Sequence, residues 1–411
     1  MNTFTDNKEV HESGGANSCS SVISLFDAYV VPNYKRNFAL IKGEGTKVWD
    51  EAGKSYLDFG GGIAVNCLGH AHPRITQTLT EQSRKLVHVS NLYYSEPQGK
   101  LAQRIVEKTG PGKVFFCNSG AEANEALFKL SRKFGAPKNR YEIITATKSF
   151  HGRTFAGISA TGQNKVKTDF QPLLPGFKHA PFNDLEAFKN SITEQTVGIL
   201  IEGIQGEGGI HLADPQFLLG LRKLTQEHEI LLLWDGVQCG AYRTGSWQSY
   251  ERILQDSGSK DFLPDGIAMA KSLGGGFPIG ATWIAQPYAD LLQPGTHGTT
   301  FGGTPLGCAV ANTVLDVIEE EELNQNITAR SEQIIQELSP LVDQDKIKTI
   351  RGLGGMIGFE PSISNFEAVK KLTLAGLLTV PAGDNIVRLL PPLNITENET
   401  HQALNLIKET L

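Results

Sequence analysis

The feature that most constrains the fold is an alternation of short apolar runs with longer amphipathic segments between about residues 74 and 310. The apolar runs predict strands buried on both faces, and the amphipathic segments at 120–135 and 215–229 predict helices. The runs are KVFFCNS (113–119), YEIITAT (141–147), VGILIEG (197–203), ILLLWD (230–235) and GIAMA (266–270). This alternation indicates βαβ units, so we expect an α/β fold with a mostly parallel sheet flanked by helices.

The two ends of the chain have a different pattern. Residues 23–73 contain a β-like stretch with a turn near Glu51–Gly53, and residues 311–411 mix a strand-like MIGFE with a long helical pattern at 310–338. We expect the two ends to pack together as a smaller, discontinuous α/β domain beside a large domain of residues 74–310.

Composition and charge exclude several function classes. The 411 residues carry a formal net charge of −6 and no block of Lys and Arg, which argues against a nucleic-acid partner. No stretch approaches the ~18 apolar residues needed to cross a membrane. Five cysteines without C-x-x-C spacing favour reduced thiols over a disulfide framework or a zinc site. Residues 1–22 are polar, lack a signal-peptide core and contain no arginine, so we expect a mobile N-terminal arm and a cytoplasmic protein.

The motif CNSGAEANE at 117–125 follows a predicted strand and begins a predicted helix. There Ser119, Gly120 and Ala121 would present backbone N–H groups and a hydroxyl at the helix N-terminus, where anions bind well. Taken alone, a Ser-Gly pair at this position is more often a structural cap.

The motif AMAKSLGGGFPIGA places Lys271 directly after an apolar run. A lysine at the end of a buried strand is costly unless it is paired or used. Desolvation lowers the pKa of such an amine and makes it a competent nucleophile for Schiff-base chemistry. The alternative is a lysine that extends from its loop into solvent. The glycines after it lack the G-x-G-x-x-G spacing of a dinucleotide site.

Asp235 ends the run ILLLWD and places a carboxylate at the rim of the predicted core. Such an acid often caps a neighbouring loop. A strand-end acid is also what a cofactor with a pyridine ring needs to keep its ring nitrogen protonated. A phosphate cradle, a Schiff-base lysine and this acid together indicate a pyridoxal phosphate site, and their combination is far more specific than any one of them.

Two loops add weaker candidates. SFHGRT offers Phe150, which can stack on a cofactor ring, and Arg153, which can bind a carboxylate through two hydrogen bonds. GTHGTTFGG offers the hydroxyls of Thr299 and Thr300 to a phosphate. Each of these residues, taken singly, is more often a plain loop feature.

From about residue 24 onward, the chain resembles the class-III pyridoxal-phosphate-dependent aminotransferases of fold type I, and among them the acetylornithine aminotransferases most. The matching motifs are YLDFGGGIAVNCLGHAHP, SNLYYSEP, CNSGAEANEALFKLSRKFG, SFHGRTFAGISATG, IQGEGGI, AKSLGGGFPIGA and GTHGTTFGGTPLGCAVANTVLDVIEEE. The resemblance implies Lys271 as the lysine that carries the cofactor and Asp235 as the partner of its ring nitrogen. Gln238 would bind the phenolic oxygen, and Val237 would pack on the ring face opposite Phe150.

The same resemblance implies roles around the phosphate and the substrate. Ser119, Gly120 and Ala121 would hold the phosphate, and Thr300 would reach the phosphate of a neighbouring subunit, which implies a homodimer with shared active sites. Arg153 would bind the α-carboxylate of the amino acid, and Thr299 is a further substrate-side candidate.

The resemblance also implies a gate and a reaction. Glu207 would mask Arg388 while an acylated donor is bound and release it for the second carboxylate of glutamate. The implied reaction moves an amino group from N-acetylornithine to 2-oxoglutarate, giving N-acetylglutamate 5-semialdehyde and glutamate in arginine biosynthesis with ping-pong kinetics. Ornithine, succinyldiaminopimelate and 4-aminobutyrate are alternative donors. The tyrosine with which ornithine aminotransferases bind a free α-amine is missing from residues 59–70, which favours an acylated donor.

The chain departs from the family pattern most clearly at Gly236, where the family carries glutamate between the aspartate and the valine. We hypothesise that Gly236 alters the local backbone and that Tyr242 fills the space. A rival of another class is a catalytically silent protein of the same fold, against which Lys271 and Asp235 weigh. Metal hydrolysis is weaker still, because His70 and His72 lack a third ligand at a recognisable spacing, and we expect no metal.

Overall fold

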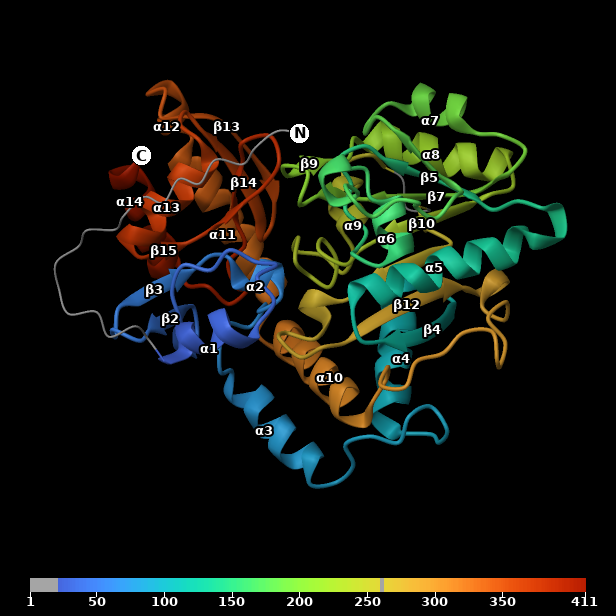
Figure 1. The fold of residues 1–411 in the computed structure, drawn as a ribbon, viewed down its shortest axis with the longest axis horizontal. Helices are drawn as coiled ribbons and strands as arrows, with labels where there is room; N and C mark the ends of the chain where they lie inside the picture. The colour runs from blue at the N-terminus through green and yellow to red at the C-terminus, as the bar shows by residue number, and fades with distance from the viewer. Residues whose placement is uncertain (1–20, 259–261) are drawn as a thin grey trace.

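The computed structural model describes residues 21–258 and 262–411, which form two lobes joined along helix α10 (Pro305–Glu320) (Figure 1). Of the expected N-terminal arm, residues 1–20 lie outside the described part of the chain, and residues 21 and 22 begin helix α1 (Ser21–Tyr29).

The larger lobe is built on a seven-stranded sheet in the order β4-β12-β11-β10-β7-β5-β6. Strand β12 runs antiparallel to both of its neighbours, and the other recorded pairs in the sheet are parallel, so the expected mostly parallel sheet is confirmed. The pattern did not predict β12 or β6. In sheet order the strands are β4 (Gly112–Cys117), β12 (Gly280–Ala285), β11 (Gly266–Met269), β10 (Leu231–Asp235), β7 (Thr196–Glu202), β5 (Glu142–Ala146) and β6 (Phe177–Ala180).

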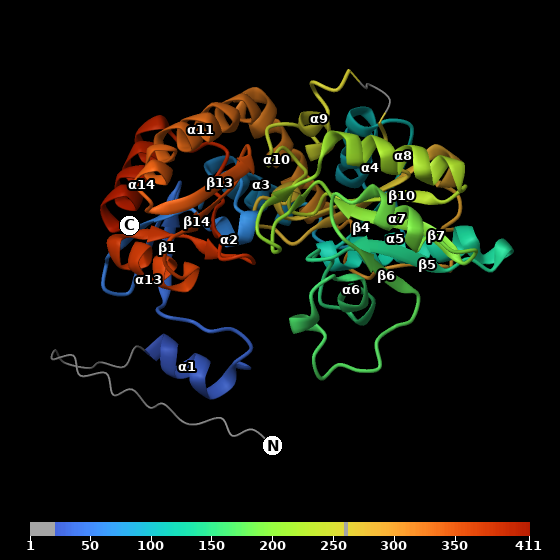
Figure 2. The same cartoon turned by 90° about the horizontal axis from the view of Figure 1, so that it is seen from above.

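Helices cover both faces of this sheet because its central strands are apolar on both sides. In β10, Leu231 and Leu233 pack toward helix α5 (Gly120–Gly135), while Leu232 and Trp234 pack toward helix α8 (Pro215–Glu227). Figure 2 shows α8 and α4 (Glu96–Thr109) on one side of the strands and α5 and α6 (Phe155–Ala160) on the other. By the same alternation Asp235 falls on the α5 side.

The smaller lobe joins the two ends of the chain. Strand β15 (Leu377–Leu378) pairs in parallel with β3 (Ser55–Asp58), completing a sheet in the order β1-β2-β3-β15. A second sheet has the order β13-β14-β17-β16. The other strands of these two sheets are β1 (Leu40–Glu44), β2 (Lys47–Asp50), β13 (Ile347–Leu353), β14 (Met356–Pro361), β16 (Val380–Pro381) and β17 (Val387–Leu389). Strands β8 (Ile204–Gln205) and β9 (His211–Leu212) form a separate two-stranded sheet.

One long helical pattern was expected at 310–338. The structure instead has two helices in this region, α10 and α11 (Leu323–Leu338). Glu322 between them has a left-handed backbone with φ of 52°, which a continuing helix does not allow. The other helices are α2 (Gly61–Ala64), α3 (Pro73–Ser83), α7 (Leu185–Ser191), α9 (Ser249–Ile253), α12 (Pro340–Asp343), α13 (Asn365–Ala375) and α14 (Glu397–Thr410). In the described ranges, no helix has the length and apolar character that a membrane span requires.

Candidate active site

A cavity of about 440 Å³ opens at the carboxyl ends of β7, β10 and β11, beside the first turn of α5. Ligands of α/β folds collect at this edge of the sheet. Nine of the sequence-predicted residues line it: Ser119, Gly120, Ala121, Phe150, Arg153, Asp235, Val237, Gln238 and Lys271. The fold therefore gathers segments that lie far apart in the sequence around one space.

Asp235 is held by two side chains that the sequence analysis did not single out. Its Oδ2 atom accepts a hydrogen bond from Asn124 Nδ2 at 2.7 Å and lies 2.8 Å from His151 Nδ1. Its Oδ1 atom accepts from the backbone N–H of Val237 at 3.1 Å. The carboxylate is thereby fixed in one orientation in the core. Asn124 lies one helical turn after Gly120, and His151 follows Phe150. The signal available was that each is a polar residue inside a motif already singled out, CNSGAEANE and SFHGRT.

Glu202 is a second buried carboxylate at this edge, and it lines the cavity as well. It is the register partner of Asp235 on the adjacent strand β7, and it accepts a hydrogen bond from the backbone N–H of Phe150 at 3.2 Å. Burial, together with the neighbouring charge of Asp235, raises the pKa of Glu202 well above its usual value. Glu202 thus holds its proton more firmly than a solvated glutamate.

Lys271 follows β11 and begins a short 3₁₀ turn with a positive φ of 45°, an uncommon conformation for a residue with a side chain. Within residues 21–258 and 262–411 its amine has no recorded hydrogen bond or ion pair. Burial lowers the pKa of Lys271 to about 8, although the carboxylates of Glu207, Asp235 and Glu202 oppose the shift. A large share of this amine is therefore neutral and nucleophilic slightly above neutral pH.

The start of α5 forms an anion cradle. Ser119 is the N-cap, and its hydroxyl accepts a hydrogen bond from the backbone N–H of Glu122 at 3.2 Å. The N–H groups of Gly120 and Ala121 belong to the first helical turn, where no helical acceptor exists, and both residues line the cavity. Gly120 admits no side chain, because a Cβ atom there would lie 2.4 Å from Val237 Cγ1.

Arg153 and Phe150 lie together on one wall of the cavity. The Cζ atom of Arg153 is 5.6 Å from the centroid of the Phe150 ring. The Arg153 side chain is exposed, and no described residue forms an ion pair with it. Its guanidinium group is therefore available to a carboxylate.

The expected gate residues are in contact. Arg388 lies on β17 and Glu207 in the loop after β8, which are far apart in the chain. Arg388 Nη1 donates to Glu207 Oε1 at 2.6 Å and to Gln238 Oε1 at 3.2 Å. The Arg388 side chain is 1% exposed and that of Glu207 is 28% exposed, so a buried arginine pairs with a half-buried carboxylate. Burial alone would raise the pKa of Glu207, but Arg388 outweighs it and holds that pKa below its usual value.

Thr299 and Thr300 do not line the cavity. Thr299 Oγ1 accepts hydrogen bonds from Asn118 Nδ2 at 3.1 Å and from the backbone N–H of Gly302 at 3.2 Å, so it shapes its own loop. Thr300 is exposed.

Gly236 is enclosed by Gln248, and the hypothesis that Tyr242 fills this space is wrong. A Cβ atom at Gly236 would lie 2.5 Å from Gln248 Oε1 and 3.1 Å from the carbonyl oxygen of Ala268. The Tyr242 ring instead packs on Trp247 at a centroid distance of 5.7 Å. Gln248 on the following segment therefore occupies the space beside Gly236.

The cavity fits the expected pyridoxal phosphate. The first-turn N–H groups of α5 match a phosphate, and the fixed carboxylate of Asp235 matches a protonated ring nitrogen. Lys271 supplies an unpartnered amine of lowered pKa in the same cavity. In the part of the chain that the structure describes, no cluster of His, Cys, Asp and Glu could hold a metal ion.

Comparisons with known proteins agree with this geometry. Residues 29–411 match the family described as class-III aminotransferase. The acetylornithine aminotransferase of Caldanaerobacter subterraneus is 43% identical over 396 residues, which cover 95% of this chain and 99% of that protein. The succinylornithine transaminase of Yersinia pestis is 43% identical over 394 residues, covering 92% and 94%. A solved ornithine aminotransferase of Toxoplasma gondii, with pyridoxal phosphate at partial occupancy, superposes with a TM-score of 0.89 at 30% identity, covering 95% and 93%.

Proposed function

Since this chain belongs to the class-III aminotransferases, we propose that it transfers the distal amino group of N-acetylornithine to 2-oxoglutarate with pyridoxal phosphate as its cofactor. The products are N-acetylglutamate 5-semialdehyde and glutamate, in arginine biosynthesis in the cytoplasm. Relatives at 43% identity with acylornithine-directed names support this choice of donor.

The observation that carries the proposal is the difference between two arginines. Arg153 is exposed and without an ion pair among the described residues, whereas Arg388 is buried against Glu207 at 2.6 Å. One carboxylate receptor is therefore open and the other is masked. This arrangement suits a donor with one free carboxylate, and the missing tyrosine in residues 59–70 favours an acylated α-amine. An acceptor with two carboxylates needs the masked arginine released.

The residues have separable tasks in the reaction. When bound, pyridoxal phosphate supplies an aldehyde that condenses with amines and a ring that delocalises the charge left by proton removal. Asp235, fixed by Asn124 and His151, keeps a proton on the ring nitrogen. Lys271 Nζ, with a pKa of about 8, acts first as general base and then as general acid, and moves the proton of the amine-bearing substrate carbon by a 1,3-shift.

Around these two residues, the remaining groups bind and orient. The N-terminus of α5 holds the phosphate, and Gln238 holds the phenolic oxygen. Arg153 binds the α-carboxylate, while Glu207 and Arg388 select between the two substrates. Because the semialdehyde formed from the donor must leave before 2-oxoglutarate enters, the kinetics are ping-pong.

A homodimer completes the proposal. Large exposed apolar side chains, Leu92, Tyr93 and Tyr94, lie in the segment after α3. Asn91 Nδ2 donates to the carbonyl oxygens of Thr299 and Gly302 at 3.2 and 3.0 Å, so this segment adjoins the Thr300 loop. We place the second copy against this exposed surface, where Thr300 reaches the partner's phosphate.

Two measurements test the cofactor assignment. The purified protein should show a visible absorbance band, and borohydride should fix the cofactor covalently to the chain. Lys271→Ala should abolish the covalent adduct, whereas Lys223→Ala, at an exposed lysine, should retain it. A wild-type protein that binds no pyridoxal phosphate would overturn the proposal.

The donor is tested by single-turnover conversion of the bound cofactor with acetylornithine, succinylornithine, ornithine, succinyldiaminopimelate and 4-aminobutyrate. The succinylornithine arm is included because one relative carries that name. We expect the acylated ornithines to react fastest. Faster conversion by free ornithine would contradict the choice of donor.

A further inference from the structure

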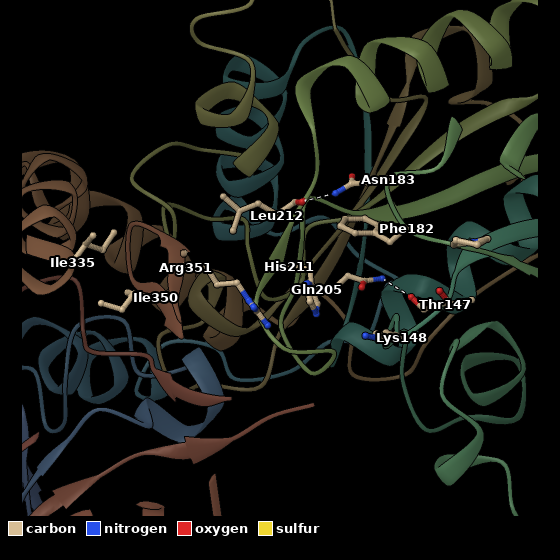
Figure 3. A pocket seen from close by; sticks show the side chains of 12 residues that line it. Thr147, Lys148, Phe182, Asn183, Gln205, His211, Leu212, Ile335, Ile350 and Arg351 are labelled. Carbon is tan, nitrogen blue, oxygen red and sulfur yellow. Dashed lines mark hydrogen bonds between the residues drawn. The ribbon is translucent and has the colours of Figure 1, made fainter. Parts of the chain in front are cut away.

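A second cavity, of about 670 Å³, lies between the two lobes and shares no lining residue with the candidate active site. Loops at the edge of the large sheet contribute Lys148 and Phe182, and strand β9 contributes His211. The smaller lobe contributes Ile350 and Arg351 (Figure 3). Nothing in the reaction proposed above uses this space.

One end of the cavity is basic. Lys148 Nζ and His211 Nε2 both contact Asp384 Oδ2, at 2.6 and 2.7 Å. Arg351 Nε donates to the carbonyl oxygen of Gly209 at 2.9 Å, and among the described residues its terminal nitrogens have no recorded partner. Burial lowers the pKa of His211, so its ring is neutral at neutral pH. This end of the cavity therefore holds two permanent cations, Lys148 and Arg351, and of these only Lys148 has a recorded ion pair with Asp384 among the described residues.

The rest of the wall is apolar. Phe182 and Leu212 line it from the large lobe, and Ile335 and Ile350 line it from the smaller lobe. Figure 3 shows the Arg351 side chain extending toward His211, with Ile335 and Ile350 on the other side of Arg351, to its left. A basic end beside an apolar wall matches a molecule with one acidic head and an apolar body.

We propose that this cavity binds a small organic anion. Its carboxylate or phosphate pairs with the free donors of Arg351 and with Lys148, and its apolar body lies against Phe182, Leu212 and Ile350. Charge-assisted hydrogen bonds from a planar guanidinium group make such recognition specific as well as strong.

The site is mechanically linked to the gate. The carbonyl oxygen held by Arg351 belongs to Gly209, two residues after Glu207. The backbone N–H of Gly383, next to Asp384, donates to the carbonyl oxygen of Glu207 at 3.0 Å. An anion that draws Lys148 from Asp384 therefore acts on the loop of Glu207. We expect a bound anion to change the glutamate concentration that half-saturates the active site. This expectation rests on the proposed function, whereas the binding of the anion does not.

Calorimetric titration of the holoenzyme, with glutamate saturating the active site, tests the binding. The probes are benzoate and phenyl phosphate, which distinguish a carboxylate head from a phosphate head, and benzyl alcohol is the uncharged control. We expect at least one anion to bind and benzyl alcohol not to bind. Arg351→Gln should weaken binding by about tenfold or more, since it removes charge-assisted hydrogen bonds.

Matched variants separate the site from general charge effects. Lys113→Gln removes one exposed positive charge, whose partner is Asp290, and should leave the affinity unchanged. Ile350→Asp places a negative charge in the wall of the cavity and should abolish binding. Arg351→Lys keeps the positive charge and should bind the anion more tightly than Arg351→Gln does. The proposal is overturned if neither anion binds while glutamate saturates the active site, if benzyl alcohol binds equally well, or if Arg351→Gln and Ile350→Asp both bind like wild type.

Discussion

His151 Nδ1 lies 2.8 Å from Asp235 Oδ2, in a part of the core where neither side chain is more than 4% exposed. Asn124 donates to the same oxygen, so the carboxylate has no rotational freedom. A carboxylate fixed in this way meets a ring nitrogen without reorganising, which is how preorganised electrostatics lower a barrier. We therefore treat His151 as a positioning residue, which acts through Asp235.

Replacing His151 tests this role directly. His151→Ala removes one hydrogen bond to a buried charge, and we expect kcat to fall by about 10- to 100-fold. The pH dependence of the visible absorbance should shift as well, because Asp235 holds the ring proton less firmly. His228→Ala, at an exposed histidine, is the control and should leave both unchanged. An unaltered pH profile in His151→Ala would rule out the positioning role.

Loading of the cofactor onto the apoenzyme should depend on pH through Lys271. Its pKa of about 8 lies below the ordinary lysine value of 10.5, so the neutral amine increases as pH rises and is half-formed near pH 8. We expect the association rate, followed by the return of visible absorbance, to rise by about tenfold per pH unit below 8 and then to level off. The rate of cofactor condensation with free Nα-acetyl-lysine, whose side-chain amine has an ordinary pKa, is the reference. An association rate that kept rising to pH 10 would mean that Lys271 has the ordinary pKa of a lysine.

Gly120→Ala should weaken cofactor binding. The added Cβ atom would lie 2.4 Å from Val237 Cγ1, so the first turn of α5 must move away from the phosphate. Overpacking of this kind costs about 1–3 kcal/mol, and we expect the dissociation constant, measured by fluorescence quenching, to rise correspondingly. Gly99→Ala, in helix α4 with no neighbouring atom within 4 Å, is the matched control and should bind as wild type does.

Restoring the family's residue by Gly236→Glu should destabilise this protein. Its Cβ atom would lie 2.5 Å from Gln248 Oε1, and we expect the free energy of unfolding in urea to drop by about 1–3 kcal/mol. Gln248→Ala opens that space, so the double variant should lose less than the sum of the two single variants. Strict additivity would mean that Gln248 does not set the identity of residue 236.

Breaking the gate pair should change substrate selection. Glu207→Gln leaves Arg388 without its carboxylate at 2.6 Å, so Arg388 becomes available to the second carboxylate of glutamate. We expect the ratio of kcat/KM for acetylornithine to that for glutamate to fall by about tenfold or more. Glu320→Gln breaks the exposed pair with Arg74, also at 2.6 Å, and should not change the ratio. A constant ratio in Glu207→Gln would remove the gate from the mechanism.

The sequence by itself determined the secondary structure of the central region and the two residues at the centre of the site. Apolar runs and helical periodicity are local patterns, so the strands that end at Asp235 and precede Lys271 were predictable. Their placement at strand ends also predicted a common cavity, because parallel strands bring their carboxyl ends to one edge.

Only the tertiary structure decided which side chains complete that site. Asn124 and His151 meet Asp235 across 111 and 84 residues, and Arg388 meets Glu207 across 181. Glu202 lies beside Asp235 only because β7 and β10 are adjacent and in that register. Local periodicity shows which side chains are buried, but strand order and register decide which of them touch. These follow from packing over the whole chain.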